Sequence, residues 1–178
     1  MHANLISHPT TANGPIARIQ VEMAREGERL WLRFTAEGAV DRVLWPAQMA
    51  PGRANDLWRH TCFEVFVRTP EGYCEFNLSP SGQWASYAFA DYREGMTDAA
   101  EVATLEPLDG ASDQVALEAR IQLPPDASAL GLSAVVEDVD GSVSYWALAH
   151  PSDKPDFHHP DSFTLALPAA GIAGRDPA

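Results

Sequence analysis

Two alternating runs of apolar and polar residues, 61–68 and 73–79, constrain this chain most, because only four residues separate them. The gap, residues 69–72, has the sequence TPEG. Proline and glycine in so short a gap indicate a β-hairpin. If these four residues form the loop, Arg68 lies opposite Tyr73, and the pairing of the other strand residues follows.

In this register the hairpin has one wholly apolar face, which a strand pair normally buries. That face carries Phe63, Val65, Val67, Cys74, Phe76 and Leu78. The opposite face carries Cys62, Glu64, Phe66, Arg68, Tyr73, Glu75, Asn77 and Ser79. Solvent explains such a mixed face, and that is the commoner arrangement for alternating polar residues. A polar ligand groove also explains it, so the sequence leaves both interpretations open.

The rest of the chain predicts an all-β fold, since short alternating runs and turn residues recur and no long helical period is present. About ten to eleven strands, one of them at 40–45, predict a single-domain antiparallel β-sandwich of immunoglobulin-like or jelly-roll-like type. The runner-up is a closed barrel. The sandwich is expected at 16–168, with a loose N-terminal tail at 1–15 and a C-terminal tail at 169–178.

Charge and composition exclude several classes of function. The formal net charge is −13, with only 12 lysines and arginines, so the chain lacks the basic patch of a nucleic-acid or anionic-membrane binder. The N-terminal residues resemble no signal peptide, and no stretch is long enough to span a membrane, so a cytoplasmic protein is expected. Cys62 and Cys74 point to opposite faces in the predicted register, which argues against a disulfide.

The loop at 150–161 contains three histidines and three aspartates, which are possible metal ligands. Their spacing matches no zinc signature, so we predict a structural loop with Asx turns and no metal site. Lys154, the only lysine of the chain, lies in this loop.

Two carboxylates on the mixed hairpin face offer a catalytic alternative. Glu64 and Glu75 are diagonal neighbours in the predicted register, at about 7–8 Å between strand positions. Glycoside hydrolases use carboxylate pairs at such separations. Pairs of glutamates on a β-face are common, however, so we predict no enzyme and keep a glycoside-acting enzyme as an alternative.

Two segments of the chain resemble the family 9 carbohydrate-binding modules and the wider DOMON-like superfamily. The first reads WRHTCFEVFV at 58–67 and is followed by YCEFNLSP at 73–80. The second reads FHHPDSFTLAL at 157–167, and SYW at 144–146 fits the penultimate strand of that family. The specific part of this resemblance covers about forty residues.

The resemblance implies a non-catalytic module that binds a sugar or a related metabolite. In the sugar-binding members two aromatic side chains clamp the sugar ring, and at the matching positions this chain has Trp58 and Phe157. The matching hydrogen-bonding positions are Glu64, Asn77 and Ser79. Phe157 stands where those members usually have tryptophan, and Asn77 where they have a longer basic side chain. The ligand's identity, partner proteins and oligomeric state are not predicted.

Other DOMON-like members bind haem b through methionine and lysine, which makes a haem b-binding domain for electron transfer or sensing the runner-up. The residues available for that role are Lys154, Met49 or Met96, and His158. Some members of the resembling family also hold structural calcium, for which no site can be placed in this sequence.

Overall fold

A computed structural model describes residues 1–11 and 14–167 of the chain. The described part contains β-strands and four short 3₁₀ helices but no α-helix, which confirms the predicted all-β class. None of its helices is long and apolar enough to cross a membrane. The strands are β1 (His2–Ser7), β2 (Ile16–Glu26), β3 (Arg29–Gly38), β4 (Gly52–Arg53), β5 (Cys62–Thr69), β6 (Gly72–Leu78), β7 (Gln83–Phe89), β8 (Thr97–Asp98), β9 (Ala103–Leu105), β10 (Asp109–Ala111), β11 (Gln114–Gln122), β12 (Ala129–Glu137), β13 (Val143–Ala147) and β14 (Leu165–Ala166); the 3₁₀ helices are η1 (Pro9–Thr11), η2 (Val40–Arg42), η3 (Leu57–Arg59) and η4 (Pro160–Ser162).

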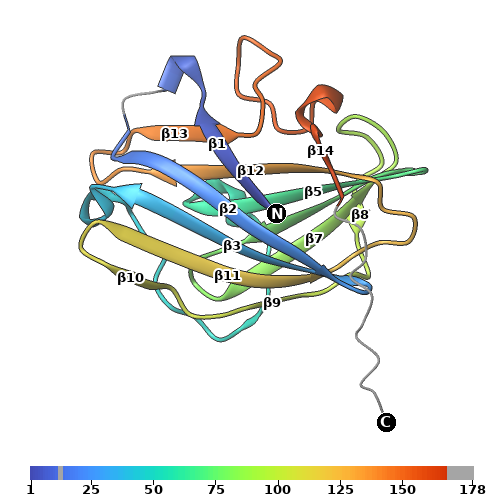
Figure 1. Cartoon of the computed structure of the whole chain (residues 1–178), viewed down its shortest axis with the longest axis horizontal. Helices are drawn as coiled ribbons and strands as arrows, with labels where there is room; N and C mark the ends of the chain where they lie inside the picture. The colour runs from blue at the N-terminus through green and yellow to red at the C-terminus, as the bar shows by residue number, and fades with distance from the viewer. Residues whose placement is uncertain (12–13, 168–178) are drawn as a thin grey trace.

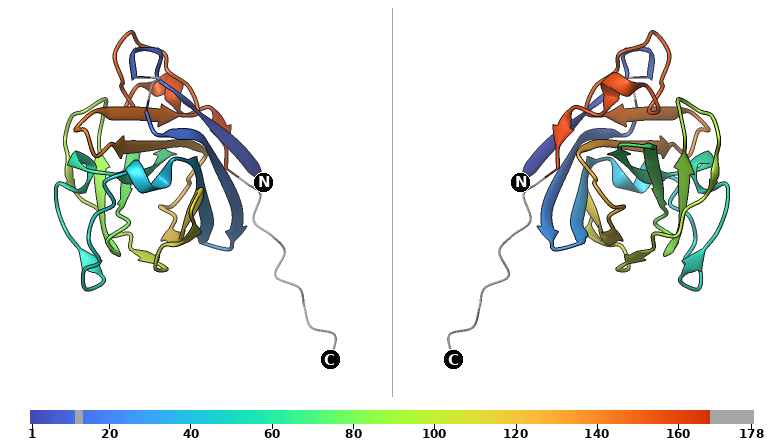
Figure 2. Two further views of the ribbon diagram at one scale, coloured as in Figure 1. Left: turned by 90° about the vertical axis from the view of Figure 1, so that its left-hand side faces the viewer. Right: turned by 90° about the vertical axis from the view of Figure 1, so that its right-hand side faces the viewer.

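The strands of the described chain form one continuous sheet that curls into two facing layers (Figures 1 and 2). The first layer runs β10-β11-β3-β2-β1 and the second runs β13-β12-β5-β6-β7-β4. Strand β1 joins them, because it pairs with β2 on one side and with β13 on the other. The pairing is antiparallel except between β4 and β7. The fold is therefore a sandwich whose two layers share one edge.

The main core fills the space between the two layers. Alternate residues of β2, β3 and β11 meet alternate residues of β5, β6 and β12 there, as the strand period of two requires. Each fully buried aliphatic or aromatic side chain stabilises the fold by about 1.5–3 kcal/mol. The largest side chains without exposure in this core include Phe34, Phe63, Phe76, Leu30, Leu78 and Ile121.

The central hairpin has the predicted register. Arg68 pairs with Tyr73, and Glu64 pairs with Asn77, across strands β5 and β6. All six residues of the predicted apolar face lie in the core between the layers. Cys62 and Cys74 are buried free thiols, as expected from their positions on opposite faces.

Two predictions about the first fifty residues are wrong. The supposed loose tail contains β1, which pairs with β2 and with β13, so backbone pairing to two strands orders a segment of weak hydrophobic pattern. The strand expected at 40–45 is instead the 3₁₀ helix η2. Val40 of this helix is buried, and Val43 after it is extended, buried and forms an isolated β-bridge with Asp138. The predicted C-terminal tail lies outside the described residues.

A glycine at the end of the hairpin loop gives the first testable prediction. Gly72 has φ +136°, and an added Cβ would lie 2.0 Å from the backbone oxygen of Phe89 in β7. We expect Gly72→Ala to lower the free energy of unfolding by about 3 kcal/mol or more, since backbone cannot move as a side chain can. Denaturant unfolding measures this.

Gly141→Ala is the matched control, because Gly141 also has a positive φ of +84° but nothing within 4 Å of an added Cβ. It should cost only about 1 kcal/mol, the price of the backbone conformation alone. Equal destabilisation by the two variants would contradict the steric explanation.

Candidate functional site

The mixed face of the central hairpin is buried, although it lies on the outer side of the second layer. Glu64 is 3% exposed and Glu75 is 5% exposed. Phe66 and Tyr73 of this face belong to a second apolar cluster, to which Phe157 is added from the segment after β13. The solvated face that spacing alone favoured is therefore wrong, because segments distant in the sequence cover the polar residues.

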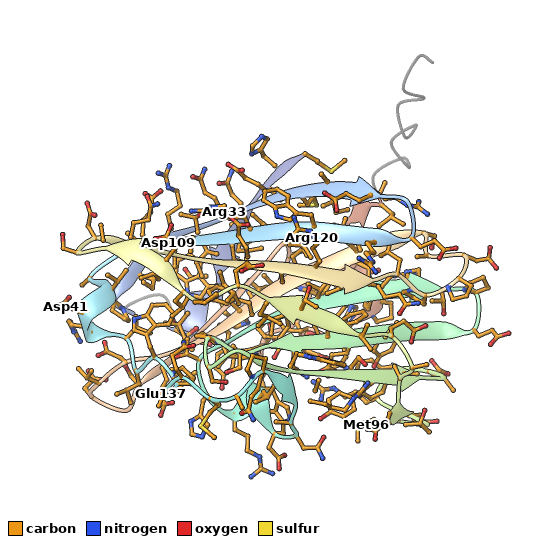
Figure 3. All side chains as sticks on the ribbon, turned by 90° about the horizontal axis from the view of Figure 1, so that it is seen from below. Arg33, Asp41, Met96, Asp109, Arg120 and Glu137 are labelled. Atoms are coloured by element: carbon orange, nitrogen blue, oxygen red, sulfur yellow. The ribbon has the colours of Figure 1, made fainter. Side chains whose placement is uncertain are left out.

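The cover leaves a cavity of about 1040 Å³ above the hairpin. It lies on the side of the molecule away from Arg33 of β3, as the position of the exposed lining residue Met96 shows (Figure 3). Strands β5, β6 and β7 supply its base, and the segments around η3, after β7 and after β13 supply its walls. The lining residues are Asn55, Asp56, Trp58, Arg59, Glu64, Glu75, Tyr87, Phe89, Arg93, Met96, Asp98, Val135, Val143, Tyr145, Pro155, Phe157 and His158.

Glu64 and Glu75 are the two carboxyl groups at the base of the cavity. The sheet register makes them diagonal neighbours, since Glu64 pairs with Asn77 and Glu75 pairs with Phe66. The Ser133 hydroxyl donates to Glu64 Oε2 at 3.2 Å, and Asn77 Nδ2 donates to Glu75 Oε1 at 2.7 Å. Glu64 therefore has one oxygen held from the neighbouring strand β12, and Glu75 has one oxygen held by Asn77 of its own strand β6.

Burial controls the protonation of this pair. It raises the pKa of Glu75 to about 7, against the opposing hydrogen bond from Asn77. Burial, and then the charge of Glu75, raises the pKa of Glu64 well above its usual range. Near neutral pH the pair therefore carries fewer than two negative charges, because a second ionisation must be made in a poorly solvated site beside the first.

Hydrogen bonds to Tyr73 bring the segments after β7 and after β13 close to Glu75. The Arg93 amide donates to the Tyr73 hydroxyl at 3.2 Å, and Tyr73 Oη lies 2.7 Å from His158 Nδ1. Burial, followed by the nearby Arg93 charge, lowers the pKa of His158 to about 4, so the ring is neutral. With Tyr73 donating to Nδ1, the ring proton sits on Nε2, which lies 3.6 Å from Glu75 Oε2.

Arg93 and Asp156 fasten two of the covering segments together. Arg93 Nη2 lies 2.9 Å from Asp156 Oδ1, and the Tyr92 hydroxyl donates to Asp156 Oδ2 at 2.5 Å. These hydrogen bonds outweigh the effect of burial and hold the pKa of Asp156 below its usual value. Arg93 has φ +55°, at the third position of the turn at 91–94 where glycine is normally preferred. This unfavourable backbone conformation of Arg93 therefore occurs at a residue that lines the cavity.

Three of the five predicted ligand-binding residues line the cavity: Trp58, Glu64 and Phe157. Trp58 is 47% exposed, whereas Phe157 is 9% exposed and packs near Tyr145. Asn77 and Ser79 are buried and are not among the lining residues. Asn77 orients Glu75, and Ser79 Oγ accepts hydrogen bonds from Ser81 in the next turn.

The structure does not gather the residues considered for haem. His158 and Met96 line the cavity, but Lys154 and Met49 do not, and both are exposed. Across residues 1–11 and 14–167, no group of three or more histidine, cysteine, aspartate or glutamate side chains is arranged to hold a metal ion. Haem binding stays a prediction, and the lysine expected as one of its ligands does not line the cavity. Calcium binding also stays a prediction.

Sequence reasoning missed several lining residues. Tyr87 and Phe89 could have been found, because they continue the mixed face into β7, where Tyr87 pairs with Glu75 and Phe89 with Tyr73. Arg93 and Asp156 carry no such signal, since both lie in irregular segments and meet only after folding.

Comparisons with known proteins return no match to a family model, a curated protein or a solved structure. The resemblance to carbohydrate-binding modules therefore rests on the quoted residues alone.

The buried carboxyls give a prediction about pH. Because the pKa of Glu75 rises from 4.5 to about 7 on folding, the folded state keeps a proton that the unfolded chain releases. The contribution of Glu75 to stability is therefore full below about pH 4.5 and is lost as pH rises through 7. We expect Glu75→Gln to be more stable than the natural chain at pH 8, by up to about 3 kcal/mol, with no such gain at pH 5.

Denaturant unfolding at both pH values checks this, with the exposed Glu71→Gln of the same hairpin as the matched control. A parallel loss of stability in Glu75→Gln and the natural chain between pH 5 and pH 8 would contradict it. His158 acts in the opposite sense, because its lowered pKa removes stability as pH falls from 6.5 through about 4.

Proposed function

We propose that this chain is a binding protein that holds a small polar metabolite, a sugar or a relative of one, in the cavity above the hairpin. The observation that carries the proposal is the composition of the lining, where Trp58 and Phe157 accompany Glu64 and Glu75. Sugars present apolar C–H faces together with hydroxyl groups, so their sites combine aromatic surfaces with a few fixed polar groups.

The size and burial of the cavity support this proposal. A volume of about 1040 Å³ accommodates a mono- or disaccharide, since ligand sites commonly occupy about 300–1000 Å³. The two carboxyl groups are oriented before any ligand arrives, by hydrogen bonds from Ser133 and Asn77. Prior orientation of this kind reduces the entropy cost of binding.

Removal of the exposed indole tests the proposal. Titration calorimetry with glucose, galactose, xylose and their β-linked disaccharides should detect binding by the natural chain. Trp58→Ala should then bind at least about tenfold more weakly, a loss of about 1.4 kcal/mol, because the exposed aromatic platform is gone.

Trp31→Ala is the control, since Trp31 lies on β3 in the other layer and does not line the cavity. Absence of heat with every sugar, or full affinity in Trp58→Ala, would refute the proposal.

Glycoside chemistry is the second candidate, and the carboxyl pair at the base of the cavity favours it. Such catalysis needs one neutral and one ionised carboxyl, and burial with mutual repulsion separates the two ionisations here. This candidate predicts hydrolysis of nitrophenyl glycosides that Glu64→Gln reduces by at least about a thousandfold, with Glu71→Gln unchanged. Absence of turnover with α- and β-linked substrates would remove it.

A further inference from the structure

The charges lining the cavity do not balance. Arg93 is paired with Asp156 at 2.9 Å, and Arg59 is paired with Asp56 at 3.2 Å. Neither arginine therefore serves as a dedicated partner for the carboxyls at the base. In the part of the chain that the structure describes, no lysine or arginine forms an ion pair with Glu64 or Glu75.

One oxygen of each glutamate lacks a strong partner among the described residues. Glu64 is hydrogen-bonded through Oε2 only, and Glu75 Oε2 faces the neutral His158 ring at 3.6 Å. Both residues are more than nine-tenths buried and line the cavity. A buried carboxylate is costly unless a cation or several hydrogen-bond donors compensate it. Protonation removes this cost when no ligand is bound, and the nearby Arg93 charge offsets it only in part, since Arg93 is paired with Asp156; a cationic occupant would compensate the ionised carboxylates directly.

The aromatic residues of the cavity, like its two carboxyl groups, suit a positively charged ligand. Five aromatic residues line the cavity, and the faces of aromatic rings attract positive charge. One of these rings already takes part in such a contact, since the Arg59 guanidinium carbon lies 5.2 Å from the centre of the Trp58 ring. The five residues are Trp58, Tyr87, Phe89, Tyr145 and Phe157.

We propose that the ligand carries a positively charged nitrogen, as an amino sugar or another small organic cation does, and that this nitrogen sits between Glu64 and Glu75. The inference rests on the proposed binding function and narrows its ligand class. A cation in this position favours ionised carboxylates, so binding displaces the protons that burial retains on them. Ligand uptake is then coupled to proton release.

Other titratable and charged groups surround the two carboxyls and set the background for this coupling. They come from β5, β6, β7, β8, the segment after β7 and the segment after β13. They are Cys62, Tyr73, Tyr87, Arg93, Asp98, Asp156 and His158. Burial raises the pKa values of Tyr73, Tyr87 and Cys62 away from neutrality, whereas it raises the pKa of Glu75 to about 7 and also raises that of Glu64, so the carboxyl pair is the expected source of the released protons.

Titration calorimetry with four probes tests the inference: glucosamine, N-acetylglucosamine, glucose and choline. At pH 7 the charged probes, glucosamine or choline, should bind at least about tenfold more tightly than the two neutral sugars. The measured heat should depend on the ionisation enthalpy of the buffer, because protons are released. Choline does not titrate, so its affinity should rise between pH 5.5 and pH 8 as the glutamates ionise. Comparison of glucosamine with choline shows whether the site prefers a charged sugar or an acyclic cation.

The double variant Glu64→Gln/Glu75→Gln should reduce the preference for charged probes to less than about threefold, while Glu71→Gln keeps it. Thermal unfolding shows whether the double variant is folded. If it is not, the single variants Glu64→Gln and Glu75→Gln are tested instead. A preference that survives both substitutions, or glucosamine and choline binding no better than glucose, overturns the inference and leaves the binding function standing. Absence of binding by all four probes overturns the inference, and failure of the wider sugar panel would remove the binding function too.

Discussion

The burial of strands β5 and β6 on both faces is the constraint on which the rest of the structure depends. Their inner face lies in the core between the layers, and apolar residues of their outer face belong to a second apolar cluster that also includes Phe157. The outer face includes Glu64 and Glu75, whose burial opposes folding when they are ionised. The apolar packing on the inner face must therefore stabilise a hairpin that carries an unfavourable polar face. If the outer face were exposed to solvent, the glutamates would stay hydrated and the core packing would not have to offset the cost of their burial.

The cover over this face is held by specific contacts more than by regular structure. Tyr73 of β6 contacts both covering segments, through the Arg93 amide and the His158 ring. Arg93 and Asp156 then join these segments directly. Figure 1 shows the segment between β13 and β14 rising beside the sheet without a strand of its own. The shape of the cavity therefore depends on a few side-chain hydrogen bonds between residues more than sixty positions apart in the chain.

The sequence was informative wherever structure depends on neighbouring residues. The register of β5 and β6 and the identity of both faces follow from alternation and a four-residue gap, and the structure confirms them. Alternation could not show that the mixed face is covered, because the cover comes from segments without a period. Strand β1 was missed for a similar reason: its order comes from pairing with β2 and β13, not from its own pattern. Glu64 was placed on the mixed face by the register, and Trp58 and Phe157 were paired as ligand contacts through a resemblance to other proteins, whereas the contact between Arg93 and Asp156 has no local signal.

Glutamine would be the simpler residue at the base of the cavity if hydrogen bonding were its only purpose. An amide oxygen can accept the hydrogen bonds that Ser133 and Asn77 donate, and an amide does not become costly to bury as pH rises. A carboxyl group differs from it by being able to ionise. Two carboxyls at the base of one cavity therefore suit a role in which protons or negative charge are exchanged, either to hold a cation or to transfer a proton during a reaction. Because each of the two lining arginines is already paired with an aspartate, the structure favours an external cation as the group that meets this charge.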